Sequence, residues 1–443
     1  MPKTPSELVI DARWVLPIAP VNDVRENASV AIAGGRIQAV GPHDQVHGQF
    51  AAARVVSLPD HVLLPGLVNA HGHAAMTLLR GLAEDAPVAE WLNDHIWPLE
   101  RRLVSEAFVR DGSRLAVAEM IKSGTTCFSD MYFFPEVTAE VARAAGLRCQ
   151  VAFPIIAFAN AWSSSVDDAL HKGMGLHDTY RNHPLVRVAF GPHSAYSVAR
   201  GDLERILMYS EELEAAVHIH LHETASEVAE ARATHGASAI ELLAAIGLLG
   251  PRLQAVHVTQ ADAAEIALLA EARVQVVHCP HSNLKLASGI CPVSALQRAG
   301  INVALGTDGA ASNNGLDLLA EARLASLLAK ITAQDARALP ESRVLEMATL
   351  GGARALGMDE DIGSLEAGKL ADLIAVDLQA PRFQPVYDPK AALVHAQSGS
   401  AVSHVWVAGQ ALLSAGGLTT LDETAALEAA RTWPARVGGR HIS

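Results

Sequence analysis

Short apolar segments of β type alternate with longer segments rich in Ala, Leu and Glu through most of this 443-residue chain. Such alternation is typical of βα units that build a parallel sheet. Eight candidate strands occur, and polar residues stand at nearly every C-terminal end. These strands end at or near His71, Asp130, Phe153, His193, His220, His257, His278 and Asp308. Because eight βα units can close into one barrel with its functional groups at the strand ends, the sequence predicts an α/β protein with a (β/α)₈ TIM-type barrel.

The two ends of the chain share a different pattern, in which short β segments are separated by turns and not by helices. Residues 6–65 contain short β segments, and Gly34-Gly35 separates two of them in the manner of a hairpin. Similar segments return at 371–376 and 404–409. We therefore expect a small β-sandwich domain made of both termini. The predicted division is 1–65 for its N-terminal part, 66–367 for the barrel, and 368–443 for its C-terminal part with a terminal helix.

Charge and composition exclude several functions. The net charge of −14 argues against a surface for nucleic acid or anionic membrane, because phosphates would repel it. The first twenty residues lack the pattern of a secretion signal, and no apolar run reaches the length of a membrane span. We expect a cytoplasmic protein. Its four cysteines show no CxxC spacing, which predicts buried free thiols instead of disulfides or a thiolate zinc site.

His71 and His73 stand two residues apart at the end of the first candidate barrel strand. In an extended strand such residues point to the same face, so both imidazoles can reach one metal ion. The segment 217–223 adds His218, His220 and His222, which the same periodicity places on one face. We prefer His220 as a third ligand because it is close to the strand exit. His218 is expected to pair with backbone carbonyls inside the barrel, and the role of His222 stays open.

Asp308 ends the last strand, where a carboxylate can bind the ion and accept a proton from its water. His257 ends the sixth strand and could orient that water. Metal binding lowers the pKa of bound water from 15.7 to about 7, and Glu223 could protonate a substrate nitrogen. No lysine occurs between Val186 and His193 to bridge a second metal, which favours one ion.

With these motifs in order, the chain resembles the amidohydrolase superfamily and, within it, the 5′-methylthioadenosine/S-adenosylhomocysteine deaminases. The resemblance runs nearly end to end. It rests on these segments: Pro65 to His73, Met76 to Gly81, Glu90-Trp91-Leu92, Pro98-Leu99-Glu100, Gly191 to Ser194, His220 to Thr224, Ser282 to Leu286, and Gly306 to Asn314.

The resemblance implies hydrolytic deamination of an adenine nucleoside, a small-molecule substrate, with one zinc ion per chain. It implies His71, His73, His220 and Asp308 as ligands. It also implies Glu223, His257 and Asp308 as catalytic groups, and Trp91, Glu100, His193, Glu223 and Asp308 as substrate contacts, with Glu100 on the ribose hydroxyls. We also expect a homo-oligomer.

One departure bears on the substrate. Relatives that accept S-adenosylhomocysteine are expected to carry arginines after the third strand, whereas residues 153–168 contain no basic residue. A carboxylate buried without a partner is costly. We therefore expect 5′-methylthioadenosine to be preferred over S-adenosylhomocysteine or adenosine, with Phe158 and Trp162 enclosing the methylthio group.

Three alternatives remain. The same metal site can serve an aminohydrolase or chlorohydrolase of another nitrogen heterocycle, such as guanine, cytosine or a triazine. Glu100 distinguishes a nucleoside deaminase from these enzymes, since a match to the family's ribose-binding glutamate implies a substrate with a ribose. A binuclear amide hydrolase would carry two metals, and a non-catalytic metal-binding barrel would release no ammonia.

Overall fold

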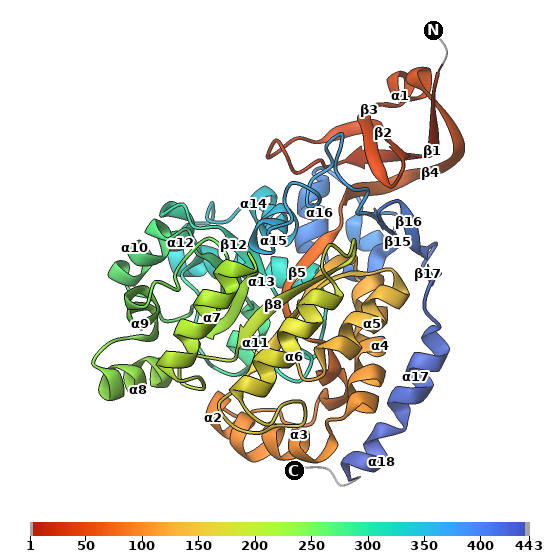
Figure 1. Cartoon of the computed structure of the whole chain (residues 1–443). Helices are drawn as coiled ribbons and strands as arrows, with labels where there is room; N and C mark the ends of the chain where they lie inside the picture. The colour runs from red at the N-terminus through yellow and green to blue at the C-terminus, as the bar shows by residue number, and fades with distance from the viewer. Residues whose placement is uncertain (1–2, 439–443) are drawn as a thin grey trace.

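A parallel sheet that closes on itself forms the centre of the computed structural model, which describes residues 3–438 (Figure 1). Its strands follow one another in chain order around the sheet, as βα units require. The strands are β5 (Leu67–His73), β6 (Thr125–Asp130), β7 (Arg148–Ile155), β8 (Val186–Pro192), β9 (Val217–Leu221), β10 (Leu253–His257), β11 (Gln275–His278), β12 (Val303–Leu305) and β13 (Asp308–Gly309).

The last barrel strand is broken into two pieces. β12 pairs with β11, whereas β13 pairs with β5 through Asp308 opposite Gly72. In the gap between β12 and β13, the Asn69 side chain accepts a hydrogen bond from the Thr307 backbone N at 3.0 Å and donates one to Thr307 Oγ1 at 2.7 Å. The two pieces therefore join both edges of the sheet, which fits the predicted TIM-type barrel.

Gly306, in the same gap, lies against β5. A Cβ at this position would lie 2.9 Å from the His71 Cβ and 3.0 Å from its backbone N. Only glycine allows this close approach without moving the backbone that carries His71.

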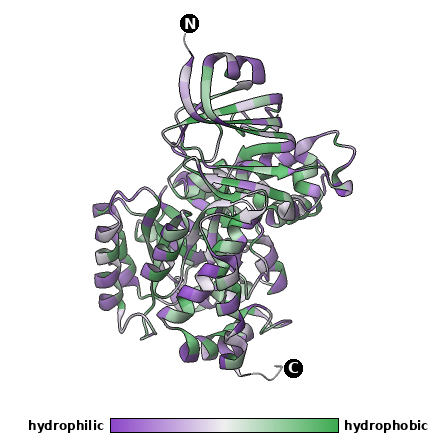
Figure 2. Cartoon of the chain, turned by 90° about the vertical axis from the view of Figure 1, so that its right-hand side faces the viewer, coloured by the Kyte–Doolittle hydropathy of each residue, from purple (hydrophilic) through white to green (hydrophobic). Residues whose placement is uncertain are grey.

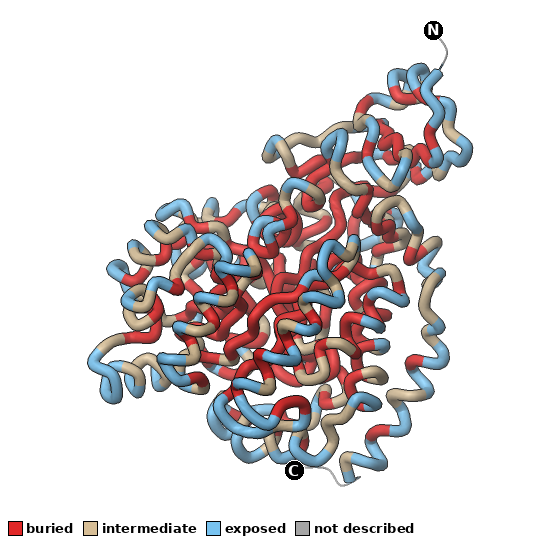
Figure 3. Tube along the Cα trace, in the orientation of Figure 1, coloured by how far each residue is buried: buried red, intermediate tan, exposed pale blue. Residues whose placement is uncertain are grey.

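Helices surround the barrel, and Figure 3 shows buried strands inside a shell of helices with exposed outer faces. Figure 2 shows the matching distribution of apolar residues along the strands and polar residues on the outside. The longer helices are α4 (Glu106–Lys122), α5 (Pro135–Ala145), α6 (Val166–Thr179), α7 (Arg200–Glu212), α8 (Ala225–His235), α10 (Ala263–Glu271) and α13 (Leu318–Ala333). Shorter ones are α9 (Ala239–Ala245), α11 (Pro280–Lys285), α12 (Val293–Arg298), α14 (Glu341–Ala348), α15 (Leu350–Ala355) and α16 (Pro389–His395).

Local sequence explains where several helices begin. At α10, the Asp262 side chain accepts from the backbone N of Glu265, and the Glu265 carboxylate accepts from the backbone N of Asp262. Ser238 and Glu241 form the same reciprocal pair at α9. Such capping boxes satisfy amide groups that the first turn leaves without partners.

Both termini contribute to a second, eight-stranded sheet. Its order is β17-β16-β15-β14-β4-β1-β2-β3, so the C-terminal strands lie beside the N-terminal ones. This agrees with the prediction that both ends share one β unit, and β2 and β3 form the hairpin expected at Gly34-Gly35. The strands are β1 (Thr4–Val15), β2 (Arg25–Ala33), β3 (Arg36–Pro42), β4 (Phe50–Pro65), β14 (Leu373–Asp377), β15 (Val402–Val407), β16 (Gln410–Ser414) and β17 (Gly417–Leu418).

A buried ion pair connects this sheet to the barrel. Arg148, at the start of β7, donates to both carboxylate oxygens of Asp372 at 2.9 and 3.2 Å. Asp372 also accepts from the backbone N of Ala408 at 2.7 Å. On another side, α17 (Glu423–Arg431) lies beside α4, where Lys122 pairs with Glu423 at 2.6 Å.

Two predictions from composition can be compared with the structure. All four cysteines are buried and free, as expected. Within residues 3–438, every helix is too short or too polar to cross a membrane.

Candidate active site

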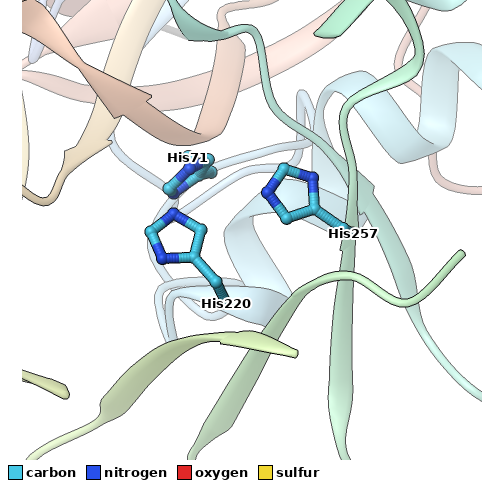
Figure 4. A group of neighbouring side chains, drawn as sticks. All are labelled: His71, His220 and His257. Atoms are coloured by element: carbon cyan, nitrogen blue, oxygen red, sulfur yellow. The ribbon is translucent and has the colours of Figure 1, made fainter. Parts of the chain in front are cut away.

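Five side chains with metal-binding atoms converge at the C-terminal ends of the barrel strands. Two groups, His71 with His73 and Asp308, and His71 with His220 and His257, each hold their ligand atoms within 4.8 Å of one another. Figure 4 shows the rings of the second group facing a common point. The structure thus brings together the four predicted ligands and the predicted water-orienting residue His257.

Hydrogen bonds to backbone carbonyls hold two of these rings in place. Nδ1 of His73 bonds the Met131 carbonyl at 2.5 Å, and Nδ1 of His220 bonds the His193 carbonyl at 2.7 Å. A backbone carbonyl can only accept, so Nδ1 carries the hydrogen in both rings. The Nε2 atoms of His73 and His220 are then free to bind a metal.

Asp308 is held from several sides. Its Oδ1 lies 3.3 Å from His71 Nε2 and 3.2 Å from His73 Nε2. Its Oδ2 accepts hydrogen bonds from Ser282 at 2.6 Å and Ser312 at 3.0 Å. Burial acts to raise the pKa of Asp308, but the neighbouring His71 and His73 side chains outweigh it and hold the pKa well below its usual range. The group is therefore a carboxylate.

The donor set fits a divalent metal ion. Nε2 of His71 is buried and has no hydrogen-bond partner, which is unusual for a buried polar atom. Burial also lowers the pKa values of His71 and His220 well below their usual range, so both rings are neutral with a lone pair available. Imidazole and carboxylate ligands in this number suit zinc and similar ions.

A cavity of about 960 Å³ opens above this cluster. Trp91, Glu100, His193 and Glu223, which were predicted from the sequence to contact the substrate, all line it. His73, His220, His257 and Asp308 form part of the same wall, whereas His71 is fully buried and is not among the lining residues.

Glu100 and Trp91 come from a helical segment that covers one side of the cavity. It consists of α2 (Val88–Glu90), a π-helical stretch (Trp91–Ile96) and α3 (Trp97–Leu103). Glu100 accepts a 2.6 Å hydrogen bond from the Tyr132 hydroxyl, and burial raises the pKa of Glu100 to about 7. Trp91 is buried, and its indole N–H has no protein partner. His193 directly follows β8, and burial lowers its pKa to about 4, so this ring is neutral.

Glu223 follows β9 in a turn that is fixed by several hydrogen bonds. Its backbone N donates to Glu227 at 2.7 Å, and its carbonyl accepts from Thr259 Oγ1 at 2.6 Å. Ser288 donates to the Glu223 carboxylate at 3.2 Å. The side chain is 17% exposed and faces the cavity, where a bound molecule can reach it.

Comparison with known proteins places this site in a family. The model of the amidohydrolase family matches residues 62–412, which is most of the chain and includes every strand of the barrel. The chain belongs to the amidohydrolase family. It is therefore a metal-dependent hydrolase.

Several relatives of this amidohydrolase match along nearly their whole length. A 5-methylthioadenosine/S-adenosylhomocysteine deaminase from Teredinibacter turnerae is 49% identical, over 97% of this chain and 98% of that protein. One with the same name from Saccharophagus degradans is 48% identical, over 100% and 99%. The crystal structure of an adenosine deaminase from Xanthomonas campestris with bound zinc superposes with a TM-score of 0.97 at 48% identity, covering 98% of this chain and 99% of that one.

The two histidines beside His220 differ from expectation. His222 does not share a face with His218 and His220, because β9 ends at Leu221 and a φ of +53° turns the chain at His222. Its Nδ1 bonds the Gln260 carbonyl at 2.8 Å, and its Nε2 accepts from the Ile240 backbone N at 3.3 Å. His222 therefore supports the loop. His218 pairs with the side chains of His71 and Gln254, and not with backbone carbonyls as predicted.

The cavity wall also differs from expectation in this amidohydrolase. Phe158 lines the cavity, but Trp162 is not among the lining residues, since its ring packs near Phe153 and its indole donates to Glu136 at 3.1 Å. Arg101 was missed: it is the one Lys or Arg among the described cavity residues. It lies on α3, about fifty residues before residues 153–168, where the sequence contains no basic residue. Its position next to Glu100 was the available signal.

Proposed function

We propose that this amidohydrolase deaminates an adenine nucleoside by hydrolysis, giving the inosine analogue and ammonia. The observation that carries the proposal is the cluster of four proposed ligands and His257, which lies beneath a cavity that Glu223 and Glu100 also line. The names of the relatives that are 48–49% identical support the same substrate class.

We assign one zinc ion per chain to His71, His73, His220 and Asp308. When bound, a divalent metal of this kind lowers the pKa of a water molecule to about 7 and so makes a nucleophile available at neutral pH. The His₃Asp set agrees with the N and O ligands that zinc takes in catalytic sites. The zinc in the structure from Xanthomonas campestris supports this choice of metal.

Protons must move as water adds to C6 of the adenine ring and ammonia leaves. Asp308 accepts the proton of the attacking water, and Glu223 protonates N1 of the purine, which removes the charge that develops there. Asp308 then passes its proton to the amine, the C6–N6 bond breaks and ammonia departs, while the hydroxyl proton on C6 moves to Glu223 and leaves a carbonyl. Protons balance, because Glu223 recovers from the C6 hydroxyl the proton that it gave to N1, and the other hydrogen of the water leaves with the ammonia.

His257 orients the attacking water in this scheme. The Asn283 side-chain amide donates to its Nδ1 at 2.9 Å, so Nε2 carries the ring hydrogen. Nε2 is therefore a donor directed to the cluster, and this supports a water-orienting role for His257 over a role as a ligand.

Glu100 is assigned to the ribose hydroxyls, Trp91 to an aromatic wall and His193 to a substrate contact. We propose that 5′-methylthioadenosine is preferred over S-adenosylhomocysteine and adenosine. Residues 153–168 offer no cation to an amino-acid carboxylate, and the exposed ring of Phe158 offers an apolar surface. Arg101 is the one group in the described wall that opposes this preference.

The test is a panel of adenosine derivatives assayed by the ultraviolet change from adenine to hypoxanthine, with metal content measured on the same sample. We expect turnover of the nucleosides, the highest kcat/KM for 5′-methylthioadenosine, and one zinc per chain. Turnover of guanine, cytosine or a triazine without any adenosine derivative would replace the proposal by another heterocycle hydrolase. A content of two metals would contradict the assigned stoichiometry.

Three sequence predictions stay proposals: a homo-oligomeric assembly, a cytoplasmic location, and the division at 65/66 and 367/368. Light scattering on purified protein measures the first. Limited proteolysis, with cuts expected near the proposed boundaries, measures the last.

A further inference from the structure

A chain of hydrogen bonds runs from His71 into the interior of the barrel. Nδ1 of His71 lies 2.8 Å from Nε2 of His218, and Nδ1 of His218 lies 2.7 Å from Oε1 of Gln254. The Gln254 side chain then donates from Nε2 to the Ala355 carbonyl at 2.8 Å. These side chains come from β5, β9 and β10, which places the chain below the predicted ligands.

The donor and the acceptor of every hydrogen bond in this series follow from its last partner, the Ala355 carbonyl. The Ala355 carbonyl can only accept, so the amide nitrogen of Gln254 faces it and the amide oxygen faces His218. That oxygen also accepts from Gln150 Nε2 at 2.7 Å, which agrees with the same orientation. Nδ1 of His218 must then carry the ring hydrogen, and Nε2 of His218 must accept from His71.

The consequence falls on His71. Since its Nδ1 donates to His218, its Nε2 keeps the lone pair and is directed at the cluster, where this atom has no hydrogen-bond partner. The opposite tautomer would place a hydrogen on the atom that is needed for the metal. His71 and His218 are fully buried and Gln254 is 1% exposed, so water does not replace a lost partner at this depth.

We propose that Gln254 and His218 are positioning residues that fix the tautomer and orientation of His71 and thereby set the metal affinity of the site. The inference rests on the proposed metal site and assigns a role to His218 that differs from carbonyl pairing. Outer partners of metal-binding histidines typically change affinity 10- to 100-fold. We expect an effect in this range from Gln254 although two side chains, those of His218 and His71, separate it from the ion.

Two pairs of variants test this on the full chain. Gln254→Met removes the acceptor for His218. Gln150→Met removes a buried amide that bonds Gln254 but leaves the acceptor in place, because Gln254 Nε2 still donates to the Ala355 carbonyl. His218→Met removes the acceptor for His71, whereas His218→Gln places an amide oxygen near the position of Nε2. Zinc dissociation constants are measured by competition with a chromogenic chelator, and melting temperatures are measured on the metal-free proteins.

We expect Gln254→Met and His218→Met to weaken zinc binding about tenfold or more. Gln150→Met is expected to stay within about threefold of wild type, and His218→Gln to recover most of the affinity that His218→Met loses. The melting temperature of metal-free Gln254→Met should fall no further than that of Gln150→Met. If His218→Met does not fold, the comparison of Gln254→Met with Gln150→Met decides.

Equal zinc affinity in wild type and Gln254→Met would overturn this inference and leave the proposed function standing. Zinc affinity that follows the expected order, without turnover of any adenosine derivative, would overturn the proposed function alone. A wild-type protein that binds no zinc would overturn both.

Discussion

Nε2 of His257 lies 3.8 Å from Oε2 of Glu223; His257 ends β10, and Glu223 follows the neighbouring strand β9. The gap exceeds a hydrogen bond, so both groups can still take part in contacts with a molecule between them. Together they place a donor and a titratable carboxyl group side by side at the floor of the cavity.

Glu223→Gln should keep the metal and lose most turnover, because an amide cannot deliver a proton to the purine ring. Roughly a 10²- to 10⁴-fold fall in kcat is expected for the loss of a general acid. Steady-state kinetics and metal analysis on one preparation measure both quantities. A variant with normal kcat would remove Glu223 from the mechanism.

Removal of metal should abolish turnover and lower thermal stability. A ligand present at a hundred times its Kd stabilises the folded state by about 2.7 kcal/mol, so chelation should reduce the melting temperature and added zinc should restore it. Differential scanning calorimetry with and without a chelator measures the shift. Full activity after complete chelation would contradict a catalytic metal.

Glu100→Gln should change how stability depends on pH. Burial raises the pKa of Glu100 to about 7, from 4.5 in an unfolded chain, so the folded protein binds more protons between these values. This contribution to stability is complete below about 4.5 and is lost as pH rises through about 7. The melting temperature of metal-free wild type, relative to the variant, should therefore fall over that range. A constant difference across it would show that Glu100 is not protonated in the fold.

Arg101→Gln should affect substrates unequally. If Arg101 meets a carboxylate at the 5′ end, its loss lowers kcat/KM for S-adenosylhomocysteine and leaves 5′-methylthioadenosine within about twofold. Lys172→Gln is a suitable control, since Lys172 contacts Asp168 and the Trp162 carbonyl and does not line the cavity. Equal losses for both substrates would assign Arg101 to the folding of the helical segment 88–103, which covers one side of the cavity.

His222→Leu and His220→Ala should separate a loop support from a ligand. His222→Leu leaves the Gln260 carbonyl and the Ile240 amide without a partner, at a cost of about 1–3 kcal/mol for a buried group, but should still bind zinc. His220→Ala should lose zinc with a smaller change in metal-free melting temperature. Zinc loss in the His222 variant alone would reverse the two assignments.

Periodicity and strand ends were enough to predict the parallel sheet and to gather His71, His73, His220 and Asp308. The reason is geometric: strands of a parallel barrel all bring their C-terminal ends to one face. Alternation along β9 misplaced His222, because the strand ends one residue earlier and the backbone turns there. No local pattern reports where a strand ends to within one residue.

Contacts between distant segments were also beyond the sequence. Arg101 reaches the cavity because a helical segment before the second barrel strand folds over the opening, and nothing near residues 153–168 indicates this. Pairing of His218 with Gln254 joins two strands, and the separation of 36 residues carries no periodic signal. Tertiary packing decides such partners.

Asp308 belongs to β13, the short piece of strand that closes the barrel against β5, and Asn69 fills the gap beside it with side-chain hydrogen bonds. Three of the four proposed metal ligands, His71, His73 and Asp308, thus lie at the seam where the barrel closes. An ion bound by side chains of both β5 and β13 would link these two strands and disfavour local opening between them. Backbone amides of 67–73 and 303–309 should therefore exchange with solvent deuterium more slowly in the zinc-loaded protein.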